Sequence, residues 1–300
     1  MKKILVIGSI NLDILAKTDH IPVEGETVIA DHGGQFRGGK GANQAYAIAK
    51  LGGCVSMLGA VGTDDAGEYV LQGLIDVGAD VKNIRKVCEE PTGQAWITIN
   101  KHGNNTITVL PGANSFVDIS YIESMKDVIS KSDIIIMQLE IPRETVLHAA
   151  VMAKKLGKIV ILDPAPAAAD LPHDLFANVD YIKPNESELE LLTGSSVSEY
   201  MEGAELLLNK GVKNVIVSLG SQGVYCHCAG KTPFHRPAYK VDAVDATAAG
   251  DTFLAGFSLS LAKGECIESS IDFAQKAASV TVTRLGAQSS MPTIAEINYL

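Results

Sequence analysis

Short runs of aliphatic residues separated by helical patterns limit the fold of this 300-residue chain more than any other feature. The runs are apolar almost throughout and lie at residues 3–7, 55–58, 134–137, 159–162 and 215–219. Helical periodicity occupies much of the chain between them, for example near residues 145–156 and 201–210. A strand that is apolar on both sides must be buried on both faces, and intervening helices join such strands in parallel. We therefore predict an α/β fold, with a doubly wound, mostly parallel sheet covered by helices on both faces.

Two segments interrupt this alternation. Residues 27–36, and the pair 94–99 with 106–110, have the pattern of strands without a helix between them. The pair flanks the turn residues Lys101-His102-Gly103-Asn104, which predicts a hairpin. We expect a small β-sheet lid formed by residues 11–37 and 92–112, beside an α/β core of residues 1–10, 38–91 and 113–300. One face of this lid would be free to cover a ligand cleft.

Charge and cysteine content narrow the functional classes. The 25 Lys and Arg residues against 35 Asp and Glu residues give a net charge of −10, which disfavours binding to nucleic acid or to an anionic membrane. No apolar stretch reaches the ~18 residues of a membrane span. The five cysteines are scattered and odd in number, as is typical of reduced thiols, so we expect a cytoplasmic protein. The order Cys226-His227-Cys228 matches no usual zinc spacing and predicts a strand.

A glycine cluster precedes the first predicted helix. Residues 34–40 match the start of a phosphate-binding GxxxxGK loop, but Gly41 stands where a Mg²⁺-binding Ser or Thr is needed. What remains is Gly38-Gly39-Lys40-Gly41, followed by Asn43 in the first helical turn. Its backbone N–H groups, with Lys40 and Asn43, are donors for a polyol or an anion. The structural alternative is a turn that only starts a helix, and so many glycines in succession favour binding.

A second cluster, Asp245-Ala246-Thr247-Ala248-Ala249-Gly250-Asp251, leads into another predicted helix. The small residues 248–250 let a ligand approach the backbone, and the N–H groups of the helix start form an anion hole. A carboxylate at this position is ordinarily a helix cap. Beside a bound phosphate, Asp251 would instead accept a proton from an attacking hydroxyl, the base role in phosphoryl transfer.

Weaker signals follow other core strands. Asn185-x-x-Glu188 fits a helix capping box and a binding motif equally well. The turn at residues 218–223 lies at the carboxyl end of a strand, where open α/β sheets bind ligands. Asn11-x-Asp13 and Gln138-x-Glu140 occupy similar positions and offer groups that bind hydroxyls.

In combination, these motifs resemble the ribokinase, or PfkB, family of carbohydrate kinases. Gly38–Gly41 with Asn43, Asn185-x-x-Glu188 and the cluster at 245–251 carry the resemblance, which extends over essentially the whole chain. It implies a Rossmann-like (ribokinase-like) domain whose β-sheet lid clasps that of a partner in a homodimer. It also implies ATP-dependent phosphorylation of the 5-hydroxyl of D-ribose to give D-ribose 5-phosphate and ADP, with Mg²⁺ and activation by K⁺.

The resemblance also implies a role for each matching residue. The sugar hydroxyls would be bound by Asn11, Asp13, Gly39, Lys40, Asn43, Glu140 and Asp251. Asp251 would be the base, and the anion hole would consist of Ala248, Ala249 and Gly250. Asn185 and Glu188 would help to place Mg²⁺ and the phosphates, and the nucleotide would contact Ser218, Gly220, Gly223, Gly250 and Gln275. The monovalent cation would be bound by Asp245, Ser290 and the carbonyl groups of Thr247, Thr281, Arg284 and Gly286.

Two positions depart from the family pattern. Ala246 replaces the usual Thr, which removes a hydroxyl near the cation loop, and Ala248-Ala249 stands where many members have Gly-Ala. Two alternatives to a ribose kinase stay open. One is a kinase for 2-deoxyribose, another pentose or a nucleoside. The other is a non-catalytic sensor of sugar or nucleotide on the same fold, because fold alone does not define activity.

Overall fold

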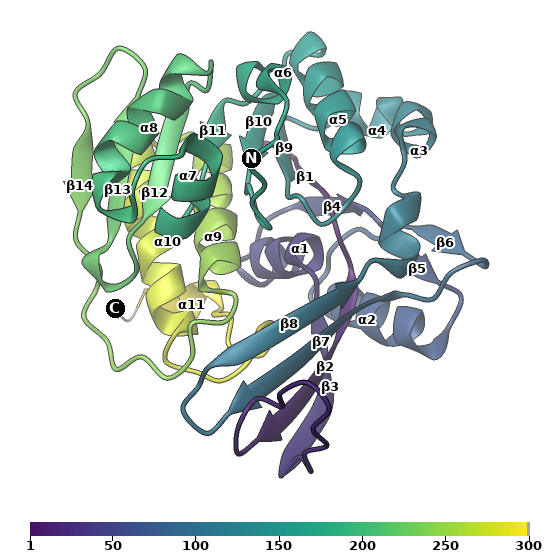
Figure 1. Cartoon of the computed structure of the whole chain (residues 1–300). Helices are drawn as coiled ribbons and strands as arrows, with labels where there is room; N and C mark the ends of the chain where they lie inside the picture. Colours follow the sequence, from purple (N-terminus) through teal and green to yellow (C-terminus); the bar gives the residue numbers. More distant parts are fainter. Residues whose placement is uncertain (299–300) are drawn as a thin grey trace.

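The computed structural model describes residues 1–298 and consists of helices packed on both faces of an eight-stranded sheet (Figure 1). The strand order is β14-β13-β12-β11-β10-β9-β1-β4. Six neighbouring strands are parallel: β12 (Asn214–Ser218), β11 (Tyr181–Ile182), β10 (Ile159–Leu162), β9 (Ile134–Met137), β1 (Ile4–Ile7) and β4 (Val55–Leu58). Only β13 (Val224–Cys228) and β14 (Phe234–Arg236) are antiparallel. The predicted mostly parallel α/β sheet is therefore confirmed.

The apolar strands are buried on both faces because their successive side chains enter two different cores. In β1, Leu5 and Ile7 belong to one hydrophobic cluster, whereas Ile4 and Val6 belong to the other. This division follows from the two-residue period of a strand. A continuous aliphatic run, rather than an alternating one, is what such a double burial requires.

Each face of the sheet has its own set of helices. One face is covered by α3 (Ile119–Ser124), α4 (Lys126–Ser130), α5 (Arg143–Lys155), α6 (His173–Ala177), α7 (Glu186–Thr193) and α8 (Tyr200–Asn209). The other face is covered by α1 (Lys40–Lys50), α2 (Asp65–Asp76), α9 (Ala249–Lys263) and α10 (Ile267–Thr281), with α11 (Ile294–Ile297) beside α10. Helix α9 packs against both α1 and α10. Within residues 1–298, no helix combines the length and the apolar character that crossing a membrane requires.

A separate four-stranded sheet projects from this body (Figure 1). Its order is β3 (His32–Gly38), β2 (Asn11–Thr18), β7 (Gly93–Asn100) and β8 (Asn105–Leu110). The predicted hairpin is confirmed by the antiparallel pairing of β7 with β8. The prediction of a strand from residue 27 is wrong, because β3 begins at His32, opposite Lys17 near the end of β2. Residues 27–31 lie beyond the paired residues of β3, although Asp31 N still donates to the Lys17 carbonyl at 2.8 Å.

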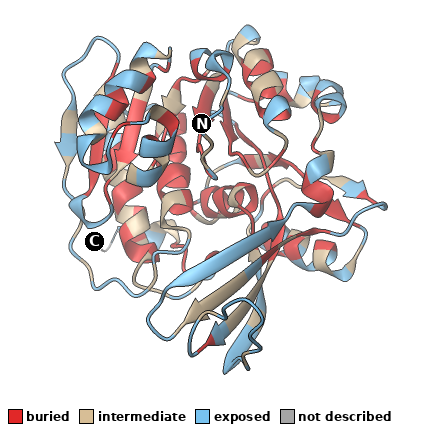
Figure 2. Cartoon of the chain, viewed as in Figure 1, coloured by how far each residue is buried: buried red, intermediate tan, exposed pale blue. Residues whose placement is uncertain are grey.

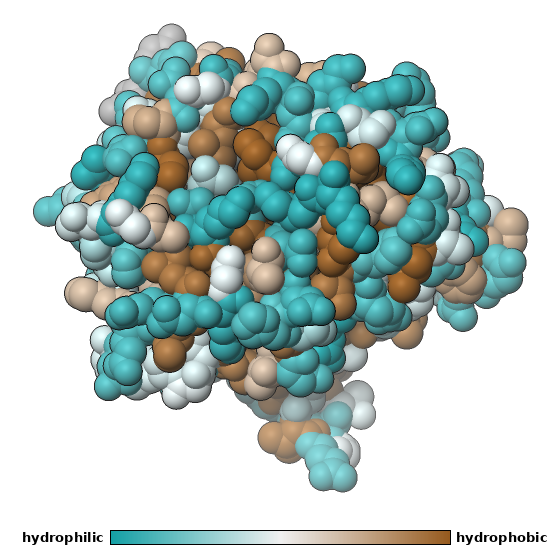
Figure 3. Space-filling view, turned by 90° about the horizontal axis from the view of Figure 1, so that it is seen from above, coloured by the Kyte–Doolittle hydropathy of each residue, from teal (hydrophilic) through white to brown (hydrophobic). Residues whose placement is uncertain are grey.

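Burial differs sharply between the two sheets. Figure 2 shows buried residues concentrated in the large body and mainly exposed or half-buried residues in the small sheet. Seen from above, hydrophilic residues cover most of the visible face of the body, and apolar residues form separate patches between them (Figure 3). Two further short parallel strands, β5 (Ala60–Gly62) and β6 (Arg85–Val87), complete the sheet structure.

Candidate active site

The start of α9 provides free backbone donors. The N–H groups of Ala248, Gly250 and Asp251 have no acceptor within residues 1–298. The N–H of Ala249, which sequence analysis placed in the anion hole, donates instead to the Ala246 carbonyl at 3.2 Å. Ala248 has a positive φ of 59°, a strained conformation that costs about 1–3 kcal/mol for a residue with a side chain and is typical of functional sites. The positive end of the helix dipole adds to the attraction for an anion at this point.

Asp251 is buried in the first turn of the same helix, with 6% of its surface exposed. Its two carboxylate oxygens accept hydrogen bonds from α1: Asn43 Nδ2 donates to Oδ2 at 3.1 Å, and Gln44 Nε2 donates to Oδ1 at 3.0 Å. The pKa of Asp251 is raised to about 6, mainly by burial and also by the charge of Asp163. Lys40 and these two hydrogen bonds act in the opposite direction and lower it. A carboxylate with this pKa is mostly ionised at neutral pH and is a stronger base than an exposed aspartate.

The glycine cluster brings α1 against the start of β2. A Cβ on Gly39, whose φ is +86°, would lie 2.7 Å from the Asn11 backbone nitrogen, and one on Gly41 would lie 2.7 Å from the Ser9 nitrogen. A Cβ on Gly38 would lie 2.1 Å from Asp13 Oδ2. The glycines are thus needed for close packing, and this packing places Asn11 and Asp13 beside the helix that carries Lys40 and Asn43.

Most backbone donors of this segment have partners inside the protein. Lys40 N donates to Glu140 Oε2 at 3.0 Å, and Ala42 N donates to the Ser9 carbonyl at 2.9 Å. Glu140 Oε2 also accepts a hydrogen bond from Ser9 Oγ at 2.5 Å. The predicted donor set therefore depends mainly on the side chains of Lys40 and Asn43 rather than on N–H groups 40–42.

Several of the sugar-binding candidates belong to a cluster of acidic side chains around one lysine. Burial raises the pKa of Asp13 to about 7, assisted by the nearby charges of Glu140 and Asp251. Burial by itself works to lower the pKa of Lys40, but four carboxylates, those of Asp163, Asp251, Glu140 and Glu188, outweigh it and raise that pKa. Lys40 is consequently a permanent cation at neutral pH in the middle of these acids. The amide of Asn11 is buried and oriented by Asn114 Nδ2, which donates to Asn11 Oδ1 at 2.7 Å.

On the other side of α9, the motif Asn185-x-x-Glu188 forms a capping box at the start of α7. Asn185 Oδ1 accepts from Glu188 N at 2.8 Å, and Glu188 Oε2 accepts from Asn185 N at 2.8 Å. Asn185 is also bridged to Ser218 at the end of β12. The capping interpretation is thus correct, and it leaves one Glu188 oxygen without a hydrogen bond inside residues 1–298.

The remaining nucleotide candidates differ in their surroundings. Gly223 has a packing reason to be glycine, because its φ is +103° and a Cβ there would lie 2.0 Å from the Arg236 carbonyl. Gly220, by contrast, borders open space. Gln275 is buried on α10, and its side chain makes no hydrogen bond with the described part of the chain. No interaction within residues 1–298 joins Gln275 to the Asn185–Ser218 pair.

The residues expected to bind the monovalent cation lie mainly in two loops, and Asp245 joins these loops by hydrogen bonds. Its Oδ1 accepts from the backbone and hydroxyl of Thr247 at 2.9 and 2.6 Å, and its Oδ2 accepts from Gly286 N at 2.8 Å. Thr281 Oγ1 donates to Thr252 Oγ1, and the Arg284 side chain binds Glu296. Ser290 Oγ donates to the Ala287 carbonyl. Within residues 1–298, no three or more His, Cys, Asp or Glu side chains form a cluster suited to a metal ion.

Sequence analysis missed three buried polar residues next to Asp251. Asp163 Oδ2 accepts a hydrogen bond from Gln44 Nε2 at 2.9 Å, and Lys183 Nζ lies 3.5 Å from Asp163 Oδ1. Lys183 also borders the start of α9, since a Cβ on Gly250 would lie 3.0 Å from its Nζ. Asp163 and Lys183 each follow a core strand, so the rule that ligands bind at the carboxyl ends of strands was the available signal. Gln44 had no signal beyond its position after Asn43.

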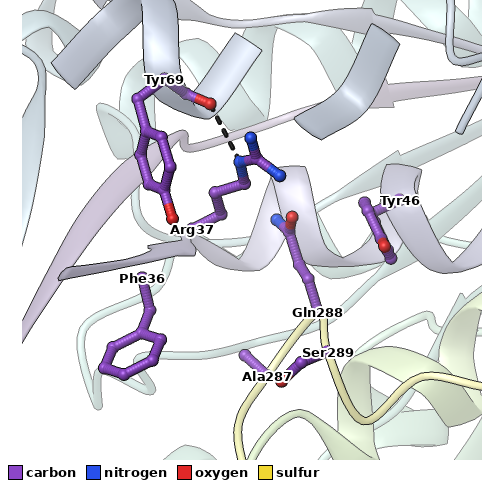
Figure 4. A pocket seen from close by; sticks show the side chains of 7 residues that line it. All are labelled: Phe36, Arg37, Tyr46, Tyr69, Ala287, Gln288 and Ser289. Atoms are coloured by element: carbon purple, nitrogen blue, oxygen red, sulfur yellow. Dashed lines mark hydrogen bonds between the residues drawn. The ribbon is translucent and has the colours of Figure 1, made fainter. Parts of the chain in front are cut away.

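A pocket of about 230 Å³ lies on the outer side of α1 (Figure 4). Arg37 crosses it, with its guanidinium 4.5 Å from the centre of the Tyr69 ring and its Nε donating to the Tyr69 carbonyl at 2.9 Å. Gln288 enters the pocket from the opposite side, and its Nε2 donates to Asn43 Oδ1 at 3.3 Å. This pocket is therefore separate from the buried acids, and Gln288 links it to Asn43, which donates to Asp251.

A buried carboxylate beside free N–H groups at a helix start is suited to phosphoryl transfer to an alcohol, because it combines a base with donors for the developing charge. The family model described as "pfkB family carbohydrate kinase" matches residues 1–294. The chain therefore belongs to the pfkB family of carbohydrate kinases.

Known relatives agree with this assignment over their whole length. A ribokinase of Schizosaccharomyces pombe is 42% identical over 99% of this chain and 97% of its own. A deoxyribokinase of Salmonella typhi is 37% identical over 98% and 97%. Among solved structures, ribokinase from Thermotoga maritima has a TM-score of 0.91 and 40% identity over 100% of this chain and 99% of that one. Arabidopsis thaliana ribokinase complexed with ribose and ATP has a TM-score of 0.93 and 33% identity over 99% and 98%. The predicted ribokinase-like fold is thereby confirmed.

Proposed function

We propose that this carbohydrate kinase transfers the γ-phosphoryl group of ATP to the 5-hydroxyl of D-ribose, giving D-ribose 5-phosphate and ADP. The observation that carries the proposal is the position of Asp251, which is buried between α1 and the start of α9 with hydrogen bonds to both of its oxygens. The similarity to ribokinases, one of them solved with ribose and ATP, supports the choice of substrates.

The sugar would lie among the polar groups at the start of α1 and β2. Its hydroxyls would be bound by Asn11, Asp13, Gly39, Lys40, Asn43 and Glu140, with the 5-hydroxyl directed at Asp251. The buried acids and amides suit a polyhydroxyl ligand, because the sugar hydroxyls would give them hydrogen-bond partners. A ligand that lacks one of these hydroxyls would leave a buried polar group without a partner, at a cost in affinity. Holding the reacting hydroxyl next to the carboxylate removes much of the entropic cost of the reaction.

In the transfer step, the sugar oxygen forms a bond to the γ-phosphorus while the bond from that phosphorus to the bridging oxygen of ADP breaks. The hydroxyl proton passes to Asp251. The charge that develops on the phosphoryl oxygens is stabilised by the free N–H groups of Ala248, Gly250 and Asp251 and by the Lys40 cation. The nucleotide would extend from there along Ser218, Gly220, Gly223 and Gln275.

The residues present fit the two implied cations. Mg²⁺ commonly uses one or two carboxylates together with water and substrate phosphates, and the Glu188 oxygen that has no hydrogen bond within residues 1–298 can serve this purpose. Asn185 Oδ1 already accepts from Ser187 Oγ and Glu188 N, so Asn185 would hold Glu188 in place. K⁺ would be held by Asp245, Ser290 and the carbonyl groups of Thr247, Thr281, Arg284 and Gly286. When bound, Mg²⁺ neutralises phosphate charge.

We further propose that residues 11–37 and 92–112 act as a lid over the α/β core. The pairing of β2, β3, β7 and β8 puts Leu15, Phe36, Ala95, Ile97, Ile107 and Val109 on the same face as Asp13, which we call the Asp13 face. Phe36, Ile107 and Val109 are exposed on this face. Exposed apolar side chains of this kind suit a second copy of the chain, so the lids would form the dimer interface. The five cysteines are free, which accords with a cytoplasmic location.

An assay of ADP release over a panel of pentoses and nucleosides tests the function. We expect the highest kcat/KM with D-ribose. The 37% identity to a deoxyribokinase makes 2-deoxyribose the second candidate, and a higher kcat/KM with that sugar would replace ribose as the substrate. Binding of ribose and ATP without any ADP formation would instead identify a sensor.

A further inference from the structure

We propose that Gln44 is a positioning residue that fixes the orientation of the Asp251 carboxylate toward the sugar hydroxyl. This inference rests on the proposed function, because it assigns Asp251 the role of the base. It concerns a residue that touches neither sugar nor nucleotide in that proposal. Gln44 is fully buried on α1, one residue after Asn43.

The amide nitrogen of Gln44 joins two carboxylates. Its Nε2 donates to Asp163 Oδ2 at 2.9 Å and to Asp251 Oδ1 at 3.0 Å. A side-chain amide has two N–H donors, so both are used. Two buried carboxylates repel each other, and a neutral group that donates to both lets them be close without a proton between them. Gln44 therefore links the base to a second acid that the mechanism does not otherwise use.

The orientation of this amide is fixed by a third residue. Gln138 Nε2 donates to Gln44 Oε1 at 2.5 Å. Rotating the Gln44 amide by half a turn would direct its oxygen at two carboxylates and its NH₂ group at another NH₂ group. Gln138 in turn occupies space beside Gly8, where a Cβ would lie 1.9 Å from Gln138 Oε1. The glycine that ends β1 thus allows Gln138 to hold Gln44, and Gln44 to hold Asp251.

The charges around Asp251 show why its position needs support. Its charge interacts with those of Lys40 on α1, Asp13 on β2 and Asp163 after β10. Lys183, after β11, lies beside Asp163 and against the start of α9. Lys40 attracts the carboxylate, and the two other acids repel it. Hydrogen bonds to fixed amides hold the carboxylate at one angle within this field, and the bond from Gln44 also stabilises its ionised form.

Gln44→Met tests the proposal, because methionine has a similar shape and no hydrogen-bonding donor. We expect kcat to fall by about 10- to 100-fold, as is typical of a misplaced catalytic group, with the KM for ATP changed only a few-fold. We also expect the acid limb of the kcat/KM profile to move to higher pH by about one unit, since an ionised carboxylate has lost a donor. Gln44→Glu, which adds a third acid, should move this limb further in the same direction.

Two more variants make the result decisive. Gln138→Met removes only the support of Gln44 and should give a smaller change of the same kind, which keeps the proposal testable if Gln44→Met does not fold. Gln72→Met is the matched control, because Gln72 also donates to an aspartate, Asp76 at 2.7 Å, but on the exposed side of α2. It should leave kcat and the pH profile unchanged.

The outcomes separate the two proposals. A wild-type enzyme that forms no ADP with any sugar refutes the proposed function, and this inference with it. An active wild type whose Gln44→Met and Gln138→Met variants keep the wild-type acid limb refutes the positioning role alone, even if kcat falls, because lost packing would explain such a fall. A parallel loss of kcat and shift of the acid limb supports it.

Discussion

The two sheets of this protein depart from ordinary burial in opposite directions. At the carboxyl edge of the eight-stranded sheet, ionisable groups are buried: Asp163, Lys183 and Asp251 are 1%, 5% and 6% exposed. In the four-stranded sheet, apolar groups are exposed: Ile107 is 55% exposed and Phe36 is 47% exposed. In the first region charged side chains are shielded from solvent, and in the second region apolar side chains are exposed to solvent.

The burial of charged groups and the exposure of apolar groups each cost free energy in the isolated chain. Each of them indicates a different kind of binding partner. Buried charges are retained where a site needs shifted pKa values and strong local fields. Exposed apolar faces are typical of surfaces that another protein covers. The comparison therefore accords with the two proposals, a small polar substrate at the large sheet and a second copy of the chain at the small one. Asp13 belongs to both regions, because β2 carries it at the base of the Asp13 face.

The largest effect is expected from removing the buried charge at the site. Asp251→Asn should lower kcat by about 10²- to 10⁴-fold, the usual loss of a general base, because the amide cannot accept the hydroxyl proton. ATP affinity should stay within a few-fold of the wild-type value. Steady-state kinetics and nucleotide binding measured by calorimetry check both statements.

Asp180→Asn is the matched control for that variant. Asp180 is also a buried aspartate, but it lies at the amino end of β11 and accepts from Lys154 at 2.7 Å, Lys213 at 2.9 Å and Val160 N at 2.9 Å. These bonds, with their charges, outweigh burial and hold its pKa below the ordinary value. The control should lower the midpoint of thermal unfolding and leave kcat intact. Near wild-type turnover by Asp251→Asn would show that the base is another residue.

The next effect concerns the exposed apolar face. Ile107→Asp places a charge at the most exposed apolar side chain of the Asp13 face, on the edge strand β8, and should weaken dimerisation by about 30-fold or more, as expected for an apolar anchor of an interface. Thr108→Asp is the control, since Thr108 is the next residue along β8, is also exposed and points to the opposite face. Sedimentation velocity over a range of protein concentrations distinguishes them. If both variants dissociate equally, or if the wild type is a monomer, the Asp13 face is not the dimer interface.

A tenfold effect per pH unit is expected from titration of the buried acids. The pKa values of about 6 for Asp251 and about 7 for Asp13 predict that kcat/KM for the sugar falls as the pH decreases through 7 and then 6, because protonation of Asp13 alters a group that binds the sugar and protonation of Asp251 removes the base. Stability responds in the opposite sense. Since folding raises both pKa values, the stabilisation from protonation is present at low pH and is lost as the pH rises through them. A kcat/KM that stays constant down to pH 5 would contradict these values.

The fold was predictable because one simple pattern determines most of it. Double burial requires continuous aliphatic strands, and each of the five predicted runs is found in the central sheet. The start of β3 was not predictable, because residues 27–31 have a suitable local sequence and only the end of β2 decides where pairing stops. Local propensity is informative where burial is extensive and fails at the edges of ladders.

The candidate site was predictable to the extent that its residues are contiguous in sequence. The segments at 38–43 and 245–251 each contain several functional types together, and the structure brings Asn43 and Asp251 into contact. Asp163 and Lys183 contribute single residues from separate strands, so only folding shows that they converge. The glycines misled in part, because tight packing against residues 8–13 explains them without a ligand.

The smallest effect is expected at the cation loop, which is intermediate between the two regions because Asp245 is neither buried nor fully exposed. Burial works to raise the pKa of Asp245, but hydrogen bonds from Thr247 and Gly286 outweigh it and keep that pKa below its ordinary value. The Thr247 hydroxyl already donates to Asp245 and orders this loop, so a threonine hydroxyl at position 246 would add only one further polar group. Ala246→Thr should therefore lower the K⁺ concentration for half-maximal activation by only about 2- to 10-fold, the value of one hydrogen bond.

Thr247→Val should change K⁺ activation in the reverse direction, because it removes the hydroxyl that donates to Asp245 at 2.6 Å. Both variants are measured by titrating KCl at constant ionic strength, with choline chloride as the balancing salt. If Thr247→Val raises the K⁺ requirement and Ala246→Thr lowers it, the loop of Asp245 holds the cation that supports transfer at α9. If neither variant alters the response to K⁺, the cation does not act through Asp245.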